Sequence, residues 1–392
     1  MVVFYKKESI EPTNMTTSKK IKVLMVIGST GIGGAQAFIL NVLRNIDTSK
    51  FQIDFAVNKF APHDGIEQEC SKYGCNFYQL PYFTVYNYIR FKRAWEDFLS
   101  THQYDIVHGH STNSAAIYLG IAHKYGMKTI AHSHSAGYRG NAIERFVKMM
   151  FARKVKQVSD YWFACSDIAA RRLYGKAFKT HKKYHYIPNA IDTNKYLFNS
   201  QTRTKIREKL NIDKDTILYG HVGSFSAPKN HMFLIDVFVE VCSITPMSKL
   251  LCCGVGTLME SVKEYAKTKG ILDKVIFAGV VNNVNEYMMA MDTFIFPSIF
   301  EGFPMAILEA QASGLNIVMS DTITNEIDLT NNIYRMELQQ SPTEWAKVSV
   351  ALPVSIDNRT AKNAIIAESQ YNIKTAVKSF EKLYKELVKD GK

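Results

Sequence analysis

Two glutamates eight positions apart are the first residues whose types and spacing suggest chemistry. Glu301 follows an apolar run that ends at Phe296, and Glu309 lies in a segment predicted to be a helix from Pro304 onwards. Proline suits the start of a helix because its φ is fixed and its missing N–H has no partner there. One carboxylate before a helix and one inside it can bind hydroxyl groups at two separate ends of a ligand. A bare pair at this spacing is more often two surface residues, so its surroundings must decide.

The start of this predicted helix is also a candidate anion site. Backbone N–H groups and the helix dipole favour negative charge at a helix N-terminus. We expect a phosphate to lie over the backbone of Gly302, Phe303, Pro304 and Met305.

Two pairs of histidines end apolar runs in the N-terminal half. In each pair, His108 with His110 and His132 with His134, one residue separates the rings, so alternation along a strand places both on one face. A zinc pair is one interpretation, but no carboxylate or third ligand is near in sequence. A hydrogen-bonded structural histidine is the alternative. For His108 and His110 we favour packing or hydrogen bonding.

Two other patterns are weaker. The glycines of residues 31–34 do not fit G-x-G-x-x-G, and no acidic residue marks a dinucleotide ribose, which disfavours a dehydrogenase. Asp213 and Asp215 form a D-x-D, but they precede an apolar run in a polar turn. We therefore interpret them as turn residues and not as metal ligands.

The elements that must position these residues alternate as strand, loop and helix. Residues 21–27 are an apolar run typical of a buried parallel strand, residues 28–34 a glycine loop and residues 35–45 an amphipathic helix. The pattern recurs, which predicts an α/β doubly wound sheet. The strands expected in the first half are 51–57, 76–80, 105–108, 128–131 and 161–165; those in the second half are 217–222, 249–253, 275–277, 293–296 and 317–319.

The chain is too long for one ordinary core, and turn residues cluster around 187–192. We predict a flexible tail over 1–20, one Rossmann-like domain over 21–190 and a second over 191–372. A final helix within 373–392 could cap either domain and so cross back to the first. Two such domains facing each other would place the carboxyl ends of both sheets at a common cleft.

The net charge is strongly regional. The chain has 48 Lys and Arg against 36 Asp and Glu, giving +12, and residues 139–183 hold twelve of these cations with three acids. Within 139–156, apolar residues alternate with cations as in an interfacial amphipathic helix, and aromatic residues cluster at 77–91. A solvated basic helix with a buried stripe is the alternative. A nucleic-acid-binding protein is a remote one, because no recognised nucleic-acid module appears.

The compartment is inferred from cysteines and the absence of leader patterns. The six cysteines form no C-x-x-C pair and read as reduced thiols of a cytoplasmic protein. We find neither a signal-peptide pattern nor an apolar run long enough to span a membrane. Any membrane contact is therefore expected to be peripheral, on the inner face of the cell membrane.

These motifs together resemble a known family. The segment from Phe296 to Gly314, with Glu301 and Glu309, resembles the E-x7-E signature of retaining glycosyltransferases of the GT-B fold, group 1 or family-4 type. This group includes capsular and exopolysaccharide enzymes. Three more segments are similar to family motifs in the same order: Gly33-Gly34-Ala35-Gln36, residues 187–192, and Gly254-Val-Gly256.

The resemblance implies a role for each matching residue. Glu301 would contact the donor sugar, Glu309 the ribose hydroxyls and Lys229 the diphosphate, while His134 would lie near the donor sugar. Gly254 and Gly256 would belong to the donor site, and Gly33, Gly34 and Gln36 to an acceptor or diphosphate loop. The family places arginine where this chain has Ser224. That loss should weaken donor binding unless another cation, such as Arg139 or Lys183, replaces it.

The implied reaction is metal-independent transfer of a hexosyl or related group with retention. The donor would be a nucleotide-sugar co-substrate, with a UDP-sugar favoured, and no other cofactor is expected. The acceptor would be a saccharide or a polyprenyl-diphosphate-linked molecule, bound by the basic N-terminal half at an anionic membrane. The alternative is a nucleotide-sugar-binding GT-B homologue with epimerase-like, weak or no transferase activity. A phosphorylase would need a pyridoxal lysine motif that we do not find.

Overall fold

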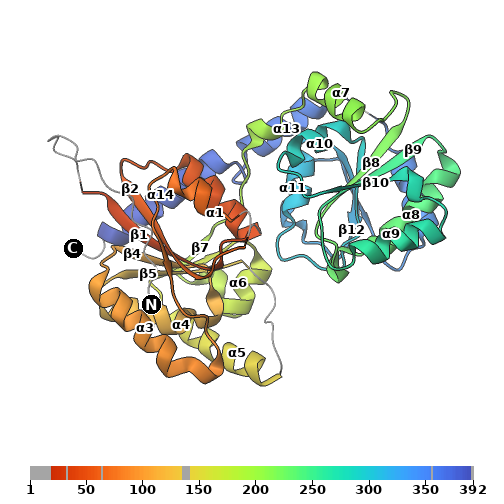
Figure 1. The fold of residues 1–392 in the computed structure, drawn as a ribbon. Helices are drawn as coiled ribbons and strands as arrows, with labels where there is room; N and C mark the ends of the chain where they lie inside the picture. Colours follow the sequence, from red (N-terminus) through yellow and green to blue (C-terminus); the bar gives the residue numbers. More distant parts are fainter. Residues whose placement is uncertain (1–18, 32–33, 63–64, 135–141, 355, 390–392) are drawn as a thin grey trace. The chain divides into compact units, whose positions relative to one another are not determined.

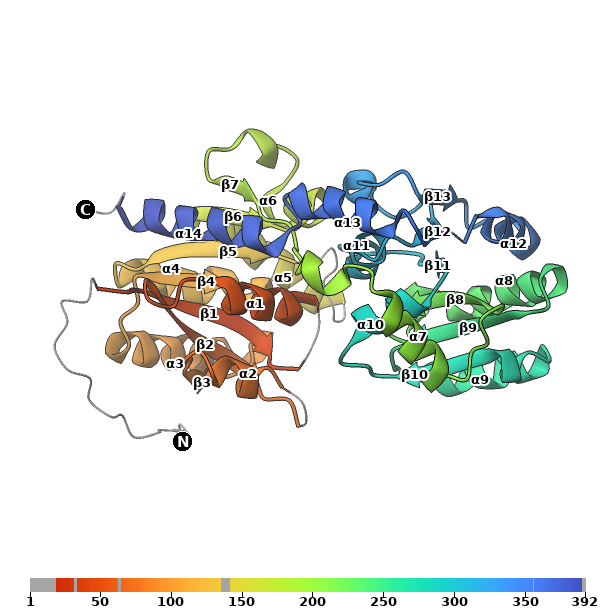
Figure 2. The ribbon, with the colours of Figure 1, turned by 90° about the horizontal axis from the view of Figure 1, so that it is seen from above.

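The computed structural model describes residues 19–31, 34–62, 65–134, 142–354 and 356–389, which form two compact units. The N-terminal unit contains the chain up to Ala190 together with the segment from Ile373 onwards, and the C-terminal unit contains Ile191–Asn372. The closing segment is the helix α14 (Ile373–Lys389), which lies with the N-terminal unit although it follows the C-terminal unit in sequence (Figures 1 and 2).

The N-terminal unit is built on a seven-stranded sheet with order β3-β2-β1-β4-β5-β6-β7, all neighbours parallel. Its central strands are apolar and buried on both faces, as expected for a sheet covered on both sides. The strand order reverses between β1 and β4, and ligands of such sheets bind at the carboxyl ends there. The strands are β1 (Ile21–Ser29), β2 (Phe51–Lys59), β3 (Phe77–Gln79), β4 (Ile106–Gly109), β5 (Lys128–Ser133), β6 (Tyr161–Ala164) and β7 (Tyr184–Tyr186).

Helices cover both faces of this sheet (Figure 1). One face packs against α1 (Gly34–Asn45), α2 (Glu67–Ser71) and α14, whose Phe380 and Tyr384 are fully buried. The other face carries α3 (Tyr88–Thr101), α4 (Ala115–Lys124), α5 (Ala142–Val158) and α6 (Asp167–Tyr174), which contact one another in that order. The helix α14 is therefore part of the first core and completes one of its two faces.

The C-terminal unit repeats the design with six parallel strands in the order β10-β9-β8-β11-β12-β13. Its reversal point lies between β8 and β11, so the loops after these two strands mark the expected ligand position. The strands are β8 (Ile217–Val222), β9 (Ser248–Cys253), β10 (Val275–Gly279), β11 (Thr293–Phe296), β12 (Asn316–Ser320) and β13 (Ile333–Met336).

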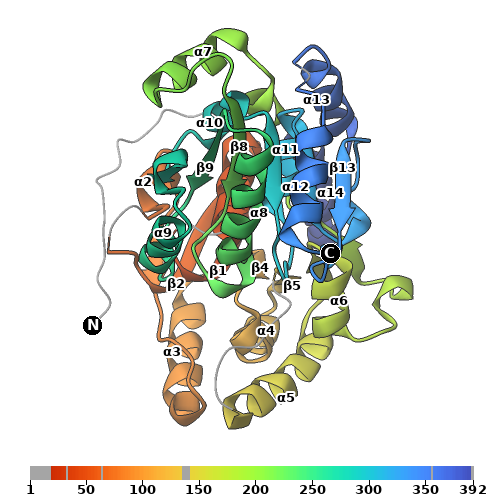
Figure 3. The same cartoon turned by 90° about the vertical axis from the view of Figure 1, so that its right-hand side faces the viewer.

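The helices of this unit again form two layers. One face carries α8 (His231–Ile244) between α9 (Met259–Thr268) and α12 (Pro342–Ala351), as Figure 3 shows. The other carries α7 (Ser200–Lys209), α10 (Val284–Ala290), α11 (Met305–Ala312) and α13 (Arg359–Glu368). Local sequence explains where α12 begins: Ser341 and Glu344 form a reciprocal capping box, and Pro342 occupies the first turn.

Two strands, β7 and β13, were not expected from the sequence, and others such as β2 and β5 are longer than expected. The edge strands β7 and β13 have three and four residues, and most of their side chains are only partly buried, so no long apolar run marks them. Strand β5 continues beyond Ala131 and includes His132 and Ser133. The expectation that the strand ends before the histidines is therefore wrong by two residues.

Candidate active site

Lys229 and Glu301 meet at the reversal point of the second sheet. Lys229 ends a short 3-10 turn (Ala227–Lys229) in the loop after β8, and Glu301 lies in the loop after β11. Their Nζ and Oε1 atoms are 2.6 Å apart, and the two side chains are only 18% and 12% exposed. Residues separated by 72 positions thus form one ion pair at the place where open α/β sheets bind ligands.

The two loops are also joined by their backbones. The Ile299 N–H donates to the Pro228 carbonyl at 2.8 Å. The Lys229 ammonium lies 4.8 Å from the centre of the Phe296 ring, within the range of a cation–π contact. Below the second loop, the Thr322 hydroxyl donates to the Ser298 carbonyl at 3.1 Å. Hydrogen bonds and a cation–π contact therefore hold the two loops that carry Lys229 and Glu301 in place.

Helix α11 begins directly after this loop. Pro304 precedes its first residue, Met305, and the Pro304 carbonyl accepts from the Ile307 N–H at 3.0 Å. Phe303 and Pro304 are both buried, and the Met305 N–H donates to the Phe303 carbonyl at 3.0 Å. Proline has no N–H, so this helix end offers fewer backbone donors over 302–305 than the sequence pattern suggested.

Glu309 is partly buried instead of lying exposed on the helix surface. Burial of its carboxyl group raises the pKa of Glu309 to about 7, although the Tyr196 hydroxyl bonded to it acts in the opposite direction. Tyr196 comes from the short turn Thr193–Tyr196 after the domain boundary, and burial together with the nearby Glu309 raises its own pKa. A carboxyl group with this pKa is poised between its neutral and charged forms at neutral pH.

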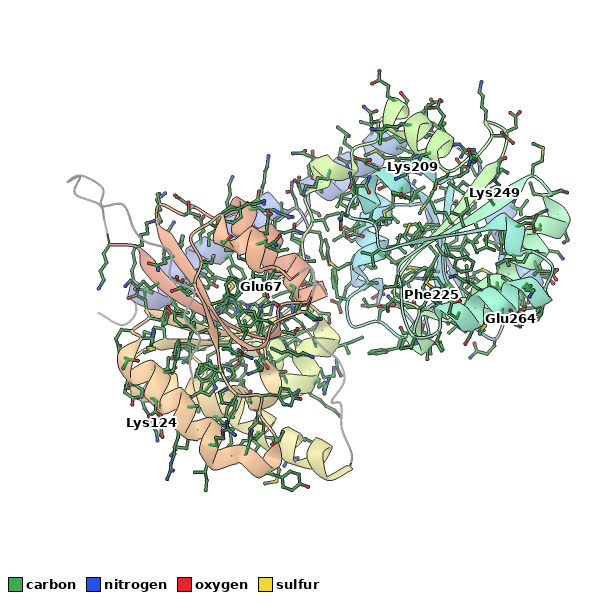
Figure 4. All side chains as sticks on the ribbon, viewed as in Figure 1. Glu67, Lys124, Lys209, Phe225, Lys249 and Glu264 are labelled. Atoms are coloured by element: carbon green, nitrogen blue, oxygen red, sulfur yellow. The ribbon has the colours of Figure 1, made fainter. Side chains whose placement is uncertain are left out.

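Gly254 and Gly256 have a steric reason for being glycine. Gly254 has a φ of +137°, and a Cβ there would lie 2.1 Å from the Gly223 carbonyl oxygen. A Cβ on Gly256 would lie 2.3 Å from the Phe225 carbonyl oxygen. Phe225, labelled in Figure 4, has no exposed surface. The loop after β9 therefore packs its backbone directly against the loop that carries Ser224 and Lys229.

The position where the family has arginine carries no charge here. Ser224 is exposed, and its hydroxyl lies 3.1 Å from that of Ser226. Of the two cations considered as replacements, Lys183 donates to the Ser159 carbonyl at 2.8 Å in the N-terminal unit. Arg139 lies outside the described residues. Asp213 and Asp215 lie in the turn before the amino end of β8, whereas Lys229 lies in the loop after its carboxyl end.

Four histidines form a hydrogen-bonded cluster in the N-terminal unit. His110 Nδ1 lies 2.8 Å from His134 Nε2, and His108 Nε2 lies 3.2 Å from His132 Nδ1. His108 Nδ1 also bonds the hydroxyl of Tyr384 on α14 at 2.6 Å. Burial lowers the pKa of all four rings, that of His134 to about 4, so they are neutral at neutral pH.

The ring geometry favours this cluster over a metal site. Ligand nitrogens of His108, His110 and His132 do lie within 4.8 Å of one another. However, the rings of His108 and His110 are stacked with their centres 4.3 Å apart at 22°, so their lone pairs lie in two separated, nearly parallel planes. An ion about 2.0–2.1 Å from each nitrogen would need the rings to rotate. Both nitrogens of His108 are also already engaged.

The glycine loop of the N-terminal unit is held by a hydrogen bond between Gln36 and Ser29. Gln36 donates to the Ser29 carbonyl at 2.8 Å, and Gly34 is the first residue of α1. Gly33 lies outside the described residues. The Thr30 hydroxyl donates to Oε1 of Glu67 at 2.5 Å, and Figure 4 places Glu67 within this unit. Glu67 and Tyr384 have no motif around them, so only the three-dimensional structure shows that Glu67 bonds Thr30 and that Tyr384 bonds His108.

The sequence of this chain matches two known families. The family described as Glycosyl transferases group 1 matches residues 202–332, and Glycosyltransferase Family 4 matches residues 32–195. EpsF of Bacillus subtilis, whose glycosyltransferase name is provisional, is 28% identical over 338 residues, 85% of this chain and 88% of that protein. The capsular polysaccharide biosynthesis glycosyltransferase CapH of Staphylococcus aureus is 23% identical over 346 residues, covering 83% and 89%.

Among solved structures, the fold is similar to that of HepE from Anabaena in complex with UDP. The TM-score is 0.76 at 15% identity, over 93% of this chain and 100% of that one. Two parallel-sheet units with these neighbours define a protein of the GT-B fold. The chain belongs to the group 1, family-4 glycosyltransferases of the exopolysaccharide and capsule type, and it is a glycosyltransferase of polysaccharide biosynthesis.

Proposed function

We propose that the protein transfers a sugar from a UDP-sugar to a lipid-linked or oligosaccharide acceptor with retention of configuration. The observation that carries the proposal is the Lys229–Glu301 pair at the β8/β11 reversal point, with Glu309 on the helix that follows. Two similar proteins add support. HepE binds UDP, and an Escherichia coli relative, 23% identical over 306 residues and covering 74% of this chain and 77% of itself, uses UDP-Gal and a diphosphoundecaprenol-linked sugar.

In this proposal the residues divide the donor between them. Lys229 binds the diphosphate, Glu301 accepts hydrogen bonds from the sugar hydroxyls and Glu309 accepts them from the ribose. The bond from the anomeric carbon to the phosphate oxygen breaks, and the acceptor oxygen bonds the same face of that carbon. The acceptor proton passes to the departing phosphate. Lys229 stabilises the charge that develops on the leaving group, which requires no metal and no cofactor besides the donor itself.

Release of UDP from a panel of sugar nucleotides, measured with membranes or lipid-linked acceptors, tests the proposal. We expect release that depends on acceptor and persists in EDTA. A Lys229→Ala, Glu301→Ala double variant should lose it, whereas Lys263→Ala with Glu260→Ala, an ion pair on α9 whose glutamate is 84% exposed, should not. Undiminished release by the first variant would refute the site. Turnover without any acceptor would instead favour the epimerase-like alternative.

We further propose that the acceptor is reached at an anionic membrane surface. None of the helices in the described part of the chain is long and apolar enough to cross a membrane. Around the start of α3, Tyr86 is 89% and Ile89 65% exposed. On α5, the neighbouring helix, Met150 is exposed beside cations, while Val155 of the predicted apolar stripe is fully buried. Phe151 of α5 stacks on Tyr88 of α3, which joins the two helices.

Vesicle sedimentation tests this contact. We expect binding to phosphatidylglycerol-containing vesicles that weakens in high salt, and little binding to pure phosphatidylcholine. Tyr86→Ser with Ile89→Ser should reduce binding. Val280→Ser is the matched control, because Val280 is 72% exposed on the other unit. Equal binding by the unmodified protein, the Tyr86→Ser, Ile89→Ser variant and the Val280→Ser control would disprove a role for the α3 surface.

A further inference from the structure

The Lys229–Glu301 ion pair suggests a second role for Glu301. The two residues proposed to bind the donor satisfy each other, with Lys229 Nζ 2.6 Å from Glu301 Oε1. Building on the proposed function, we propose that Glu301 makes the site select the intact nucleotide-sugar over the nucleoside diphosphate. The carboxylate would thereby help to expel UDP after transfer.

The geometry makes a bound phosphate compete with the Glu301 carboxylate for Lys229. Both side chains are largely enclosed, and the backbone bond between Ile299 and Pro228 holds their loops together. A phosphate bound to Lys229 therefore stays close to the Glu301 carboxylate. At such a poorly solvated position two negative charges repel each other more strongly than in water.

The donor and the product differ in what they offer Glu301. An intact UDP-sugar brings hydroxyl groups that donate to the carboxylate while its diphosphate takes Lys229. Once the sugar has left, UDP still offers phosphate oxygens to Lys229 but no hydroxyl to Glu301, and its terminal phosphate carries more negative charge than before. A buried carboxylate without donors is costly, so re-forming the ion pair favours release of UDP.

The described part of the C-terminal unit offers a clear control. Lys263 and Glu260 form an ion pair of similar length, 2.8 Å, on α9, where Glu260 is 84% exposed and the pair is solvated. Replacing Glu260 by glutamine changes the net charge as much as replacing Glu301. Only the position of the lost charge differs between the two variants.

The test measures dissociation constants for UDP and for UDP-glucose by calorimetry, without acceptor, on the full-length protein. We expect Glu301→Gln to bind UDP about tenfold more tightly, the effect of about 1.4 kcal/mol, and to gain no affinity for UDP-glucose. Glu260→Gln should leave both constants unchanged. Glutamine can still accept from Lys229, and Glu301→Ala serves as a second variant if the first does not fold.

Two outcomes separate this inference from the proposed function. If Lys229→Met abolishes UDP binding but neither Glu301 variant gains UDP affinity, the site assignment stands and this inference fails. If Lys229→Met binds UDP as well as the unmodified protein does, the proposed donor site itself is wrong. In assays of transfer, the same Glu301 variants should be inhibited by lower concentrations of added UDP.

Discussion

The partly buried carboxyl group of Glu309 leads to a specific prediction about stability. Its pKa rises from a reference value of 4.5 to about 7 because burial disfavours the charged form. The native protein therefore holds a proton on this group that the unfolded chain releases between these two values. Stability contributed by this proton is fully present below about pH 4.5 and is lost as the pH rises to 7.

Glu309→Gln removes this titration while keeping an oxygen that can accept from Tyr196. A rise of about 2.5 pKa units, at about 1.36 kcal/mol per unit, corresponds to about 3 kcal/mol. Relative to the unmodified protein, we expect Glu309→Gln to gain about 3 kcal/mol in free energy of unfolding between pH 4.5 and pH 8. The gain should level off above pH 7.

Denaturant unfolding of the ligand-free protein at several pH values provides the measurement. The C-terminal unit needs its own signal, such as a probe attached there, because two units can unfold separately. A similar exposed change, Glu264→Gln on α9, is the control and should give no pH-dependent difference. If the Glu309→Gln difference is constant from pH 4.5 to pH 8, the carboxyl group is not buried as described.

Three more predictions follow from the described contacts. If Glu309 binds the ribose hydroxyls as a carboxylate, affinity for UDP-glucose, measured by calorimetry, should rise from pH 6 to pH 8, and Glu309→Gln should abolish this dependence. Gly254→Ala should lower the unfolding temperature of the C-terminal unit, at a cost of roughly 2–4 kcal/mol, because its Cβ would strike the Gly223 carbonyl at a φ of +137°. Ending the chain at Asn372 removes buried apolar side chains worth on the order of 10 kcal/mol, so proteolysis should digest the N-terminal unit and spare Ile191–Asn372.

The sequence predicted the parts of the fold that have strong local signals. Strand β8 and strand β11 were placed at their observed bounds, because each is an apolar run between turn residues. A final helix was expected within 373–392, and α14 spans Ile373–Lys389. The short edge strands β7 and β13 were missed because partly exposed strands of three or four residues leave little periodicity to read.

The candidate site was only partly accessible to sequence reasoning. The types and order of Lys229, Glu301 and Glu309 suggested a donor site, but the ion pair between the first two depends on parallel strands that bring distant loops together. The hydrogen bond between Glu309 and Tyr196 joins residues that lie 113 positions apart in the chain. Pairwise contacts of this kind arise from tertiary packing and leave no local pattern.

The placement of α14 has a consequence for the order of events during synthesis. The first unit is translated early, yet one face of its sheet is completed only by α14, which supplies the buried side chains of Phe380 and Tyr384. At about 5–20 residues per second, the ribosome needs on the order of ten seconds or more to make residues 191–372. During that interval the apolar side chains that α14 covers in the complete chain lack this helix as a partner, so the N-terminal unit completes its core only after the C-terminal unit has been made.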